Sequence, residues 1–259
     1  MTIEREPRRM CVERVIPWNL QSEARALALL ENPANGGDSR GAMKDRLALV
    51  KKKMWANGRT LRVGFLDGTP LLREKVQQYA NEWTKYANLR FDFGGGANPE
   101  VRVSFSADPG RSWSALGTDV LVERYFPAHQ PTMNFGWFND DTPDAELSRV
   151  IIHEFGHAIG CIHEHQNPDR GIEWDEAAVL TYFSGSPNYW SEATIRFNIL
   201  DKYKADQING TKFDLDSIML YEFPASLTRN QVGTHENDKL SSGDIAFIQE
   251  AYPRSAQQP

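Results

Sequence analysis

The chain has 259 residues, 40% of them hydrophobic and 25% charged, with a formal net charge of −6. That size and apolar content can bury a core, either as one large domain or as a domain with an appendage. The acidic balance gives no electrostatic basis for binding nucleic acid or an anionic membrane, and no apolar run approaches the roughly eighteen residues of a membrane span.

Residues 1–54 are predicted to form an N-terminal appendage, either a pro-segment or an extra structural layer. The sequence from Met1 to Arg9 lacks the apolar segment of a secretory signal peptide. A short helix is expected from Ser22 to Leu30, followed by a loop rich in helix-breaking residues from Asn32 to Gly41. The main domain is expected to span residues 55–259.

The first part of the main domain has the patterns of a mixed sheet with a helix packed on it. Alternating apolar residues predict strands at Leu61–Phe65, Leu89–Phe93 and Val101–Phe105, and a stripe at helical spacing runs from Leu72 to Tyr86. Strands that alternate with a long helix predict an α+β fold. A further short strand, Thr132–Trp137, comes shortly before the next helix.

That next helix carries the residues around which the chain is organised. Pro143 suits the first helical position, and Thr142 is expected to cap it. His153 and His157 lie one helical turn apart, so their imidazoles share one side of the helix. Glu154 is next to the first imidazole, close enough to take a proton from a water molecule on a bound metal.

A third histidine completes the predicted metal site. Zinc accepts neutral imidazole nitrogens and prefers about four ligands. On a continuous helix His163 would point about 120° away from His157, so the chain must turn back, and Gly160 can adopt the positive φ that such a helix end needs. Two other interpretations remain open: the histidines are satisfied polar groups of a helical core, or Glu176 supplies the third ligand.

A methionine and a tyrosine follow in the segment Asp216–Tyr221. The pattern His-Glu-x-x-His-x-x-Gly-x-x-His from His153 to His163 resembles the metzincin signature, and Ser-x-Met-x-Tyr resembles the astacin family. The resemblance implies that Met219 forms a hydrophobic floor under the metal. It also gives Tyr221 the role of a fifth, displaceable zinc ligand that stabilises the oxyanion.

The astacin resemblance covers about Trp55 to Tyr252 and includes Glu164–Arg170, where Asn167 replaces an arginine of the family. It implies a metzincin-type zincin fold: a twisted, mostly parallel sheet with an antiparallel edge strand, an active-site helix, a Met-turn and a C-terminal helix. It further implies that protein or peptide substrates bind along an edge strand at residues 132–137, by main-chain hydrogen bonds. Secretion is also expected from the family, although no signal peptide is seen at this N-terminus.

The last predicted element is a helix with clear signals at both ends. Ser241 can cap it, with Asp244 at the third helical position to complete a capping box, and Pro253 ends it. A closing helix after the Met-turn also resembles the astacin family.

The two cysteines, Cys11 and Cys161, allow three interpretations. Both can be free thiols, which is the default for so few cysteines. They can form a disulfide that pins the N-terminal segment beside the metal. Alternatively, Cys11 can bind the zinc as a thiolate and keep an enzyme latent, since thiolate is a strong zinc ligand.

The predicted function is zinc-dependent cleavage of peptide bonds in protein substrates, with one catalytic zinc ion and Glu154 as the general base. A first rival is a zinc-stabilised peptide-binding or toxin-type protein with incidental catalysis. Glu154 argues against it, because binding alone needs no base. A second rival is a zinc amide hydrolase with a non-protein substrate. The sequence leaves subsite preference, calcium sites and oligomeric state open.

Overall fold

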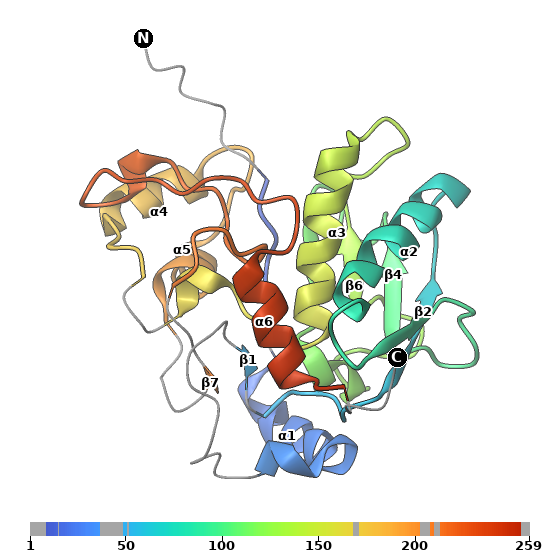
Figure 1. Ribbon diagram of the computed structural model, residues 1–259. Coiled ribbons are helices and arrows are strands. Elements are labelled where there is room, and N and C mark those ends of the chain that lie inside the picture. Colours follow the sequence, from blue (N-terminus) through green and yellow to red (C-terminus); the bar gives the residue numbers. More distant parts are fainter. Residues whose placement is uncertain are drawn as a thin grey trace.

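The computed structural model describes residues 9–14, 16–36, 49–50, 52–167, 171–202, 208–209 and 213–254. Figure 1 shows the sheet and its two long helices, α2 and α3, on one side of the molecule, and the shorter helices α4 and α5 on the other. The last helix, α6, lies between these two parts, and α1 lies beneath them. The long helices were predicted from their apolar spacing, and both are present.

The central sheet has five strands in the order β3-β2-β4-β6-β5. Strands β3, β2, β4 and β6 are parallel, and β5 pairs antiparallel to β6 at the edge. The strands are β2 (Thr60–Phe65), β3 (Arg90–Asp92), β4 (Val101–Ser104), β5 (Ser112–Ser114) and β6 (Met133–Phe135). The predicted fold class, α+β with a mostly parallel sheet and an antiparallel edge strand, is confirmed.

The prediction that residues 132–137 form the sheet edge is wrong. Strand β6 within this stretch lies between β4 and β5, and the edge is the three-residue strand β5. Main-chain groups of β6 are therefore already used on both sides. The local pattern identified a strand, but a strand's neighbours in a sheet depend on long-range pairing that the pattern of one segment does not contain.

The two long helices are α2 (Pro70–Thr84) and α3 (Asp144–Ala158). The side chain of Thr69 caps α2 by accepting from the Leu72 amide, and the Trp83 indole donates to the Ile152 carbonyl of α3 at 2.7 Å. Thr142 does not cap α3 as predicted. Its hydroxyl accepts from the Asn139 amide instead, and Pro143 takes the capping position without a side-chain bond.

The other elements are shorter. The helices are α1 (Gln21–Glu31), α4 (Glu176–Ser184), α5 (Glu192–Ile195), the π-helix η5 (Arg196–Leu200) and α6 (Ser242–Ala251). Single 3-10 turns are η1 (Trp18–Leu20), η2 (Pro33–Gly36), η3 (Gly117–Leu121), η4 (Glu164–Gln166) and η6 (Ala225–Leu227), and a small antiparallel pair joins β1 (Leu49–Val50) to β7 (Ile208–Asn209). The predicted capping box of α6, made by Ser241 and Asp244, is confirmed.

The described residues pack into two apolar clusters, and the N-terminal segment contributes to both. The larger cluster fills the space around the sheet, α2 and α3, and it includes Ile16, Leu20 and Ala24. The smaller cluster gathers around α4 and α5 and includes Met10 and Cys11. The appendage at residues 1–54 is thus packed against the main domain in its described parts, and its assignment as a pro-segment stays a prediction.

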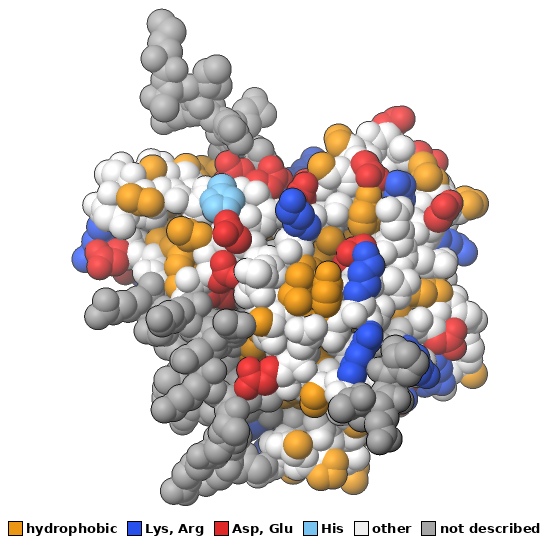
Figure 2. Space-filling view, viewed as in Figure 1, with side chains coloured by type: hydrophobic (Ala, Val, Ile, Leu, Met, Phe, Trp, Pro, Cys, Tyr) orange, Lys and Arg blue, Asp and Glu red, His pale blue; other side chains and the backbone are white. Residues whose placement is uncertain are grey.

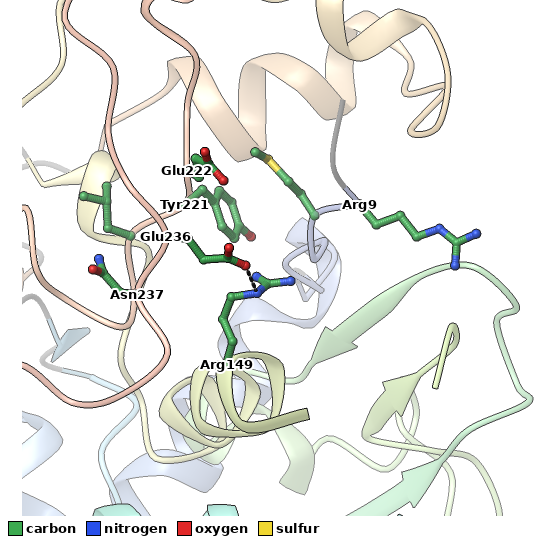
Figure 3. Close-up of a pocket in the computed structure, with 8 residues that line it drawn as sticks. Arg9, Arg149, Tyr221, Glu222, Glu236 and Asn237 are labelled. Atoms are coloured by element: carbon green, nitrogen blue, oxygen red, sulfur yellow. Dashed lines mark ion pairs between the residues drawn. The ribbon is translucent and has the colours of Figure 1, made fainter. Parts of the chain in front are cut away.

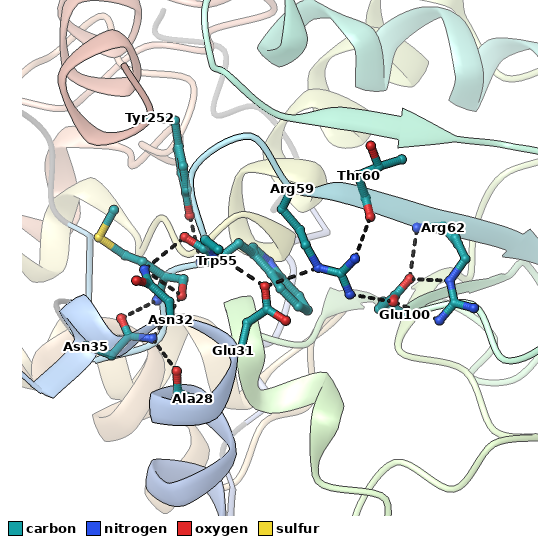
Figure 4. A network of polar contacts seen from close by, with 12 residues as sticks. Ala28, Glu31, Asn32, Asn35, Trp55, Arg59, Thr60, Arg62, Glu100 and Tyr252 are labelled. Atoms are coloured by element: carbon teal, nitrogen blue, oxygen red, sulfur yellow. Dashed lines mark hydrogen bonds and ion pairs between the residues drawn. The ribbon is translucent and has the colours of Figure 1, made fainter. Parts of the chain in front are cut away.

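A network of polar contacts joins α1 and η2 to the start of the main domain (Figure 4). Asn35 binds both sides of the Met54 peptide, donating to its carbonyl at 2.9 Å and accepting from its amide at 3.1 Å. Glu31 pairs with Arg59, and Arg59 in turn reaches Glu100 at 3.0 Å. We name this set of contacts, from Asn35 through Arg59 to Glu100 and its partner Arg62, the junction network.

The surface shown in Figure 2 carries positive and negative side chains mixed together, with no patch of one sign. Among the described residues, no helix has both the length and the apolar content needed to cross a bilayer.

Candidate metal centre

At the C-terminal end of α3 the chain reverses its direction. Gly160 has a φ of 103°, which favours glycine. Its amide donates to the His157 carbonyl, and the Cys161 amide donates to the Gly156 carbonyl, both at 2.9 Å. These two bonds form a Schellman motif. The reversal predicted at Gly160 is therefore present, and it carries the chain to His163.

The three predicted histidine ligands converge. His153 and His157 come from α3, His163 comes just after the turn, and all three are buried. The Nε2 atoms of His157 and His163 are 3.1 Å apart. The ligand atoms of the three histidines and of Cys11 all lie within 4.8 Å of one another.

The outer nitrogen of each ring faces an accepting oxygen, which fixes the tautomer; for His163 this is the Gln166 amide oxygen, 3.3 Å from Nδ1. Nδ1 of His153 lies 2.8 Å from the Ile218 carbonyl, and Nδ1 of His157 lies 2.8 Å from the Cys161 carbonyl. Because a carbonyl only accepts, each Nδ1 carries the hydrogen and each Nε2 presents a lone pair. Burial lowers the pKa of all three histidines, that of His157 to about 4. The rings are therefore neutral at pH 7, as metal ligands must be.

Cys11 brings a fourth donor from the N-terminal segment. Its Sγ lies 3.2 Å from Nε2 of His153, 3.2 Å from Nε2 of His163 and 3.7 Å from Nε2 of His157. The Tyr221 hydroxyl is 2.6 Å from the same sulfur and contacts His163 Nε2. Cys11 and Tyr221, both predicted as site residues, thus lie at the histidine cluster.

This donor set fits zinc. Bonds of about 2.0–2.1 Å to nitrogen and 2.3 Å to sulfur in a tetrahedron put two nitrogens about 3.3 Å apart and a nitrogen and a sulfur about 3.6 Å apart. The His157–His163 separation of 3.1 Å and the three sulfur distances of 3.2–3.7 Å are close to these values. Three imidazole lone pairs and a thiol sulfur directed at one point suit a borderline-soft cation, and no proton arrangement satisfies all of them.

Glu154 lies next to the cluster. Its side chain is fully buried, and neither carboxylate oxygen has a hydrogen-bond partner. Burial raises the pKa of this carboxyl well above its ordinary value, and the nearby Cys11 thiol and then the charge of Arg149 oppose the rise. A buried carboxylate without partners is costly for the fold, which marks a group kept for chemistry rather than for stability.

Met219 lies in the predicted Met-turn and packs against α3 at Gly156. It is fully buried, and a Cβ at Gly156 would overlap its sulfur, so the glycine in the zinc helix makes room for the methionine. The Met219 carbonyl accepts from the Glu164 amide at 2.9 Å, which ties the Met-turn to the segment after His163.

The alternative ligand Glu176 lies elsewhere. It is in the first turn of α4, and its carboxylate pairs with Arg196 at 2.5 Å. The interpretation that it completes the metal site is wrong. The Asn167 that replaces a family arginine is buried, and its amide nitrogen lies 3.4 Å from the Glu164 carboxylate. Residues 168–170 lie outside the described part of the chain.

A small pocket opens beside Tyr221 (Figure 3), and the sequence interpretation did not identify it. Arg9 and Met10 of the N-terminal segment line it together with Arg149 of α3 and the chain after the Met-turn. Arg149 pairs with Glu236 at 2.9 Å. The sequence did contain one indication of this pocket, because Arg149 precedes His153 by one helical turn and so lies on the same side of α3.

Both cysteines are free and buried. The disulfide interpretation is therefore not realised in the structure. Cys161 packs in the larger apolar cluster, whereas Cys11 points into the histidine cluster. Burial raises the pKa of the Cys11 thiol well above its ordinary value when no cation is bound.

The parts described so far define a class of protein. A mostly parallel sheet with an antiparallel edge, a helix that presents two histidines and a glutamate, a third histidine after a glycine turn and a methionine floor are the features of a metzincin zinc peptidase. Comparisons with known proteins narrow this class. The family model described as Astacin, a peptidase family, matches residues 143–252.

A solved structure of myroilysin is 44% identical, covers 80% of this chain and 99% of its own, and has a TM-score of 0.75. Nematocyst expressed protein 6 of Nematostella vectensis is 28% identical over 86% of this chain and 71% of that protein. High choriolytic enzyme 1 of Oryzias latipes, a hatching enzyme zinc-protease, shares only the fold, at 16% identity and a TM-score of 0.54 over 78% of this chain and 96% of its own. The chain belongs to the astacin family, and it is a zinc metalloendopeptidase.

Proposed function

We propose that this chain is a latent zinc endopeptidase, in which Glu154 is the general base and the N-terminal segment occupies the substrate cleft. The observation that carries the proposal is the meeting of three neutral imidazoles, the unpartnered Glu154 carboxylate and Cys11 at one buried point. His153, His157 and His163 would hold one zinc ion. The zinc would supply a Lewis acid that polarises the scissile carbonyl and acidifies a water molecule.

The chain's own groups then move the protons and hold the charge. Glu154 takes a proton from the attacking water and later delivers it to the leaving amine. Tyr221 turns its hydroxyl to the oxygen of the scissile carbonyl and donates a hydrogen bond as negative charge develops there. The hydroxyl is already at the ligand cluster, so a small rotation is sufficient.

Substrate binds along β5, which replaces residues 132–137 in this role. An extended peptide placed antiparallel to an edge strand gains main-chain hydrogen bonds whatever its sequence. Side-chain selection is then left to pockets, and the one beside Tyr221 lies next to the predicted ligands. When the N-terminal segment withdraws, Arg9 and Met10 no longer line that pocket, which leaves it open to a substrate side chain.

The N-terminal segment blocks this cleft in the full chain. Its Val12 amide donates to the Ser112 carbonyl of β5 at 3.0 Å, and Arg14 forms a parallel bridge with Ala115. The segment therefore uses the edge that substrate needs. It runs parallel to β5, opposite to the direction expected of a substrate, so its peptide bonds do not present their carbonyls for attack. Cys11 fills the fourth ligand position.

Digestion of a protein substrate tests the proposed reaction. We expect purified chain, freed of its N-terminal segment, to cleave casein, to lose activity with a chelator and to regain it with zinc. A peptide-binding protein with incidental catalysis would bind unfolded casein without cutting it. An enzyme for non-protein amides would leave a peptide library intact. Either result contradicts the proposal.

Substitution of the cysteine tests latency. Cys11→Ala removes a zinc ligand and weakens the hold of the segment, so we expect casein cleavage by the full chain to rise at least about tenfold. Cys161→Ala is the matched control, because it removes a second buried thiol that has no contact with the ligand atoms. Equal activity of the Cys11→Ala chain and the unaltered chain would remove the latency assignment and leave the reaction untouched.

A further inference from the structure

A buried carboxylate outside the metal centre is linked to one of its ligands. Asp244 lies in the first turn of α6 and is fully buried. Its Oδ2 accepts from two amides, that of Ser241 at 2.9 Å and that of Ile218 at 2.8 Å. Its Oδ1 accepts from the Ser217 hydroxyl at 2.8 Å. A capping box needs only the bond to Ser241, so two bonds go beyond capping.

The two additional bonds reach the Met-turn at Ser217 and Ile218, and the Ile218 carbonyl faces a predicted ligand. Ile218 donates its amide to Asp244, and its carbonyl accepts from His153 Nδ1 at 2.8 Å. Ser217, once bonded to Asp244, also accepts from the Met219 amide at 3.1 Å. One carboxylate thus fixes the turn at two successive residues, directly beside the acceptor of the ligand's outer nitrogen.

We propose that Asp244 is a positioning residue of the metal centre, which sets the orientation of the His153 ring through the main chain of Ile218. The inference rests on the proposed zinc site. Partners of the outer nitrogen of a metal-bound histidine fix its tautomer and ring direction, and their loss typically costs about 10–100-fold in metal affinity. Here the partner is a main-chain carbonyl, which cannot be substituted, so its position depends on what holds the turn.

Among the described residues, Asp244 is the only side chain that accepts from the Ile218 amide, although Asn237 also holds the turn by donating to the Ser217 carbonyl at 2.9 Å. The neighbouring Asp214 accepts from the Ser241 hydroxyl and uses its amide to donate to Glu164, without a bond to Ile218. Burial raises the pKa of Asp244 to about 6. At pH 7.5 it is therefore a carboxylate, which can accept all three hydrogen bonds.

Metal binding to the full chain at pH 7.5 tests this role directly. The probes are Zn²⁺, titrated against a chromophoric chelator, and Co²⁺, whose visible spectrum reports ligand geometry. For Asp244→Ala we expect zinc affinity to fall about tenfold and the cobalt spectrum to change as the His153 ring reorients. For Asp244→Asn we expect affinity within about twofold of the unaltered chain, since an amide keeps the shape and one accepting oxygen.

Ser241→Ala is the matched control. It removes the cap hydroxyl from the same helix and leaves the Asp244–Ile218 bond in place. We expect it to lower the melting temperature while zinc affinity and the cobalt spectrum stay as in the unaltered chain. If it weakened zinc binding as much as Asp244→Ala, the role of Asp244 would be merely structural and the proposal would be wrong.

A second variant covers the case in which Asp244→Ala does not fold. Ser217→Ala removes the hydroxyl that joins Oδ1 to the Met-turn but keeps the Ile218 bond. We expect a smaller loss of zinc affinity, about threefold. Unchanged affinity in every folded variant overturns the inference. An unaltered chain that bound no zinc would instead overturn the metal centre itself, which separates the two failures.

Discussion

The molecule contains two polar regions, one part-buried and one fully buried, that differ in whether their groups have partners. In the junction network (Figure 4), each group of the chain meets a complementary group. Both oxygens of Glu100 accept, Oε1 from Arg59 and Arg62 and Oε2 from the amide and Nε of Arg62. No buried side-chain nitrogen or oxygen of the described network is without a partner. Such a region is complete without any ligand.

The metal centre is incomplete by the same criterion. Three Nε2 lone pairs and a sulfur face one another, and both oxygens of Glu154 are without partners. Burial acts in the same direction on all of these groups, because it favours their neutral forms. The comparison teaches that burial and polarity do not distinguish a functional site from a structural one. The two regions differ in their partners: the junction network is complete with the chain's own groups, whereas the metal centre would need a bound cation and a substrate to complete it.

The largest effect should follow from removing the base while the metal ligands remain. For Glu154→Gln in the Cys11→Ala chain, we expect casein cleavage to fall about 10³–10⁴-fold, because an amide cannot accept the proton of the attacking water. Zinc content should stay at one ion per chain, since Glu154 is not a ligand. Cleavage rate and metal content, measured on the same sample, check both statements.

The control for this variant is His157→Ala, which should lose zinc as well as activity. Glu154→Gln should also unfold at a temperature close to that of its parent, because a buried amide replaces a buried carboxyl of the same shape. A Glu154→Gln enzyme with full activity would show that the proton goes elsewhere.

A smaller loss is expected at the oxyanion position. Tyr221→Phe in the same background removes one hydrogen-bond donor, so we expect kcat to fall about 10²-fold with KM little changed. The zinc content should be unaffected, because the three imidazoles remain. A fall in zinc affinity as large as that of His157→Ala would assign Tyr221 to metal retention instead of catalysis.

A substitution in the junction network should change the stability of the fold and leave zinc binding unchanged. Glu100→Gln leaves Arg59 and Arg62 without their shared carboxylate, and both arginines can still reach water, since their side chains are 34% and 41% exposed. We expect the free energy of unfolding to fall by about 1–3 kcal/mol. Zinc affinity should match that of the unaltered chain. A loss of metal in this variant would mean that the two regions are coupled and the contrast between them is false.

The part of the metal centre that depends on short segments could be predicted from the sequence. His153 and His157 are set by helical spacing, and the reversal that brings His163 is set by the backbone freedom of Gly160, so both could be predicted from short segments. The capping box of α6 was equally local. The contacts between segments far apart in the chain could not be derived in this way. Cys11 meets His153 across 142 residues, and only the packing of the whole chain brings them together.

Sheet order was missed for a related reason. Strand β5 has only three residues, too few for alternation to identify it, and its pairing with both β6 and Val12 is decided by distant segments. The same applies to Asp244. Its capping role was visible three residues after Ser241, whereas its bond to Ile218 joins elements that no local pattern relates.

The smallest effect is expected from acid, which should weaken the junction network by protonating Glu100. Burial alone would raise the pKa of Glu100, but hydrogen bonds from the Arg62 side chain and amide outweigh it, and the pKa lies below its ordinary value. A carboxyl with a lowered folded pKa stabilises the fold above its unfolded pKa, and this contribution is lost as the pH falls through the folded pKa. The stability advantage of the unaltered chain over Glu100→Gln should therefore be full at pH 6 and shrink below about pH 4.5.

Urea midpoints of both chains, measured with chelator present so that zinc release adds nothing, would show it. An advantage that stayed constant down to pH 3 would mean that the arginines gain nothing from the charge of Glu100, and that its hydrogen bonds alone hold the junction network.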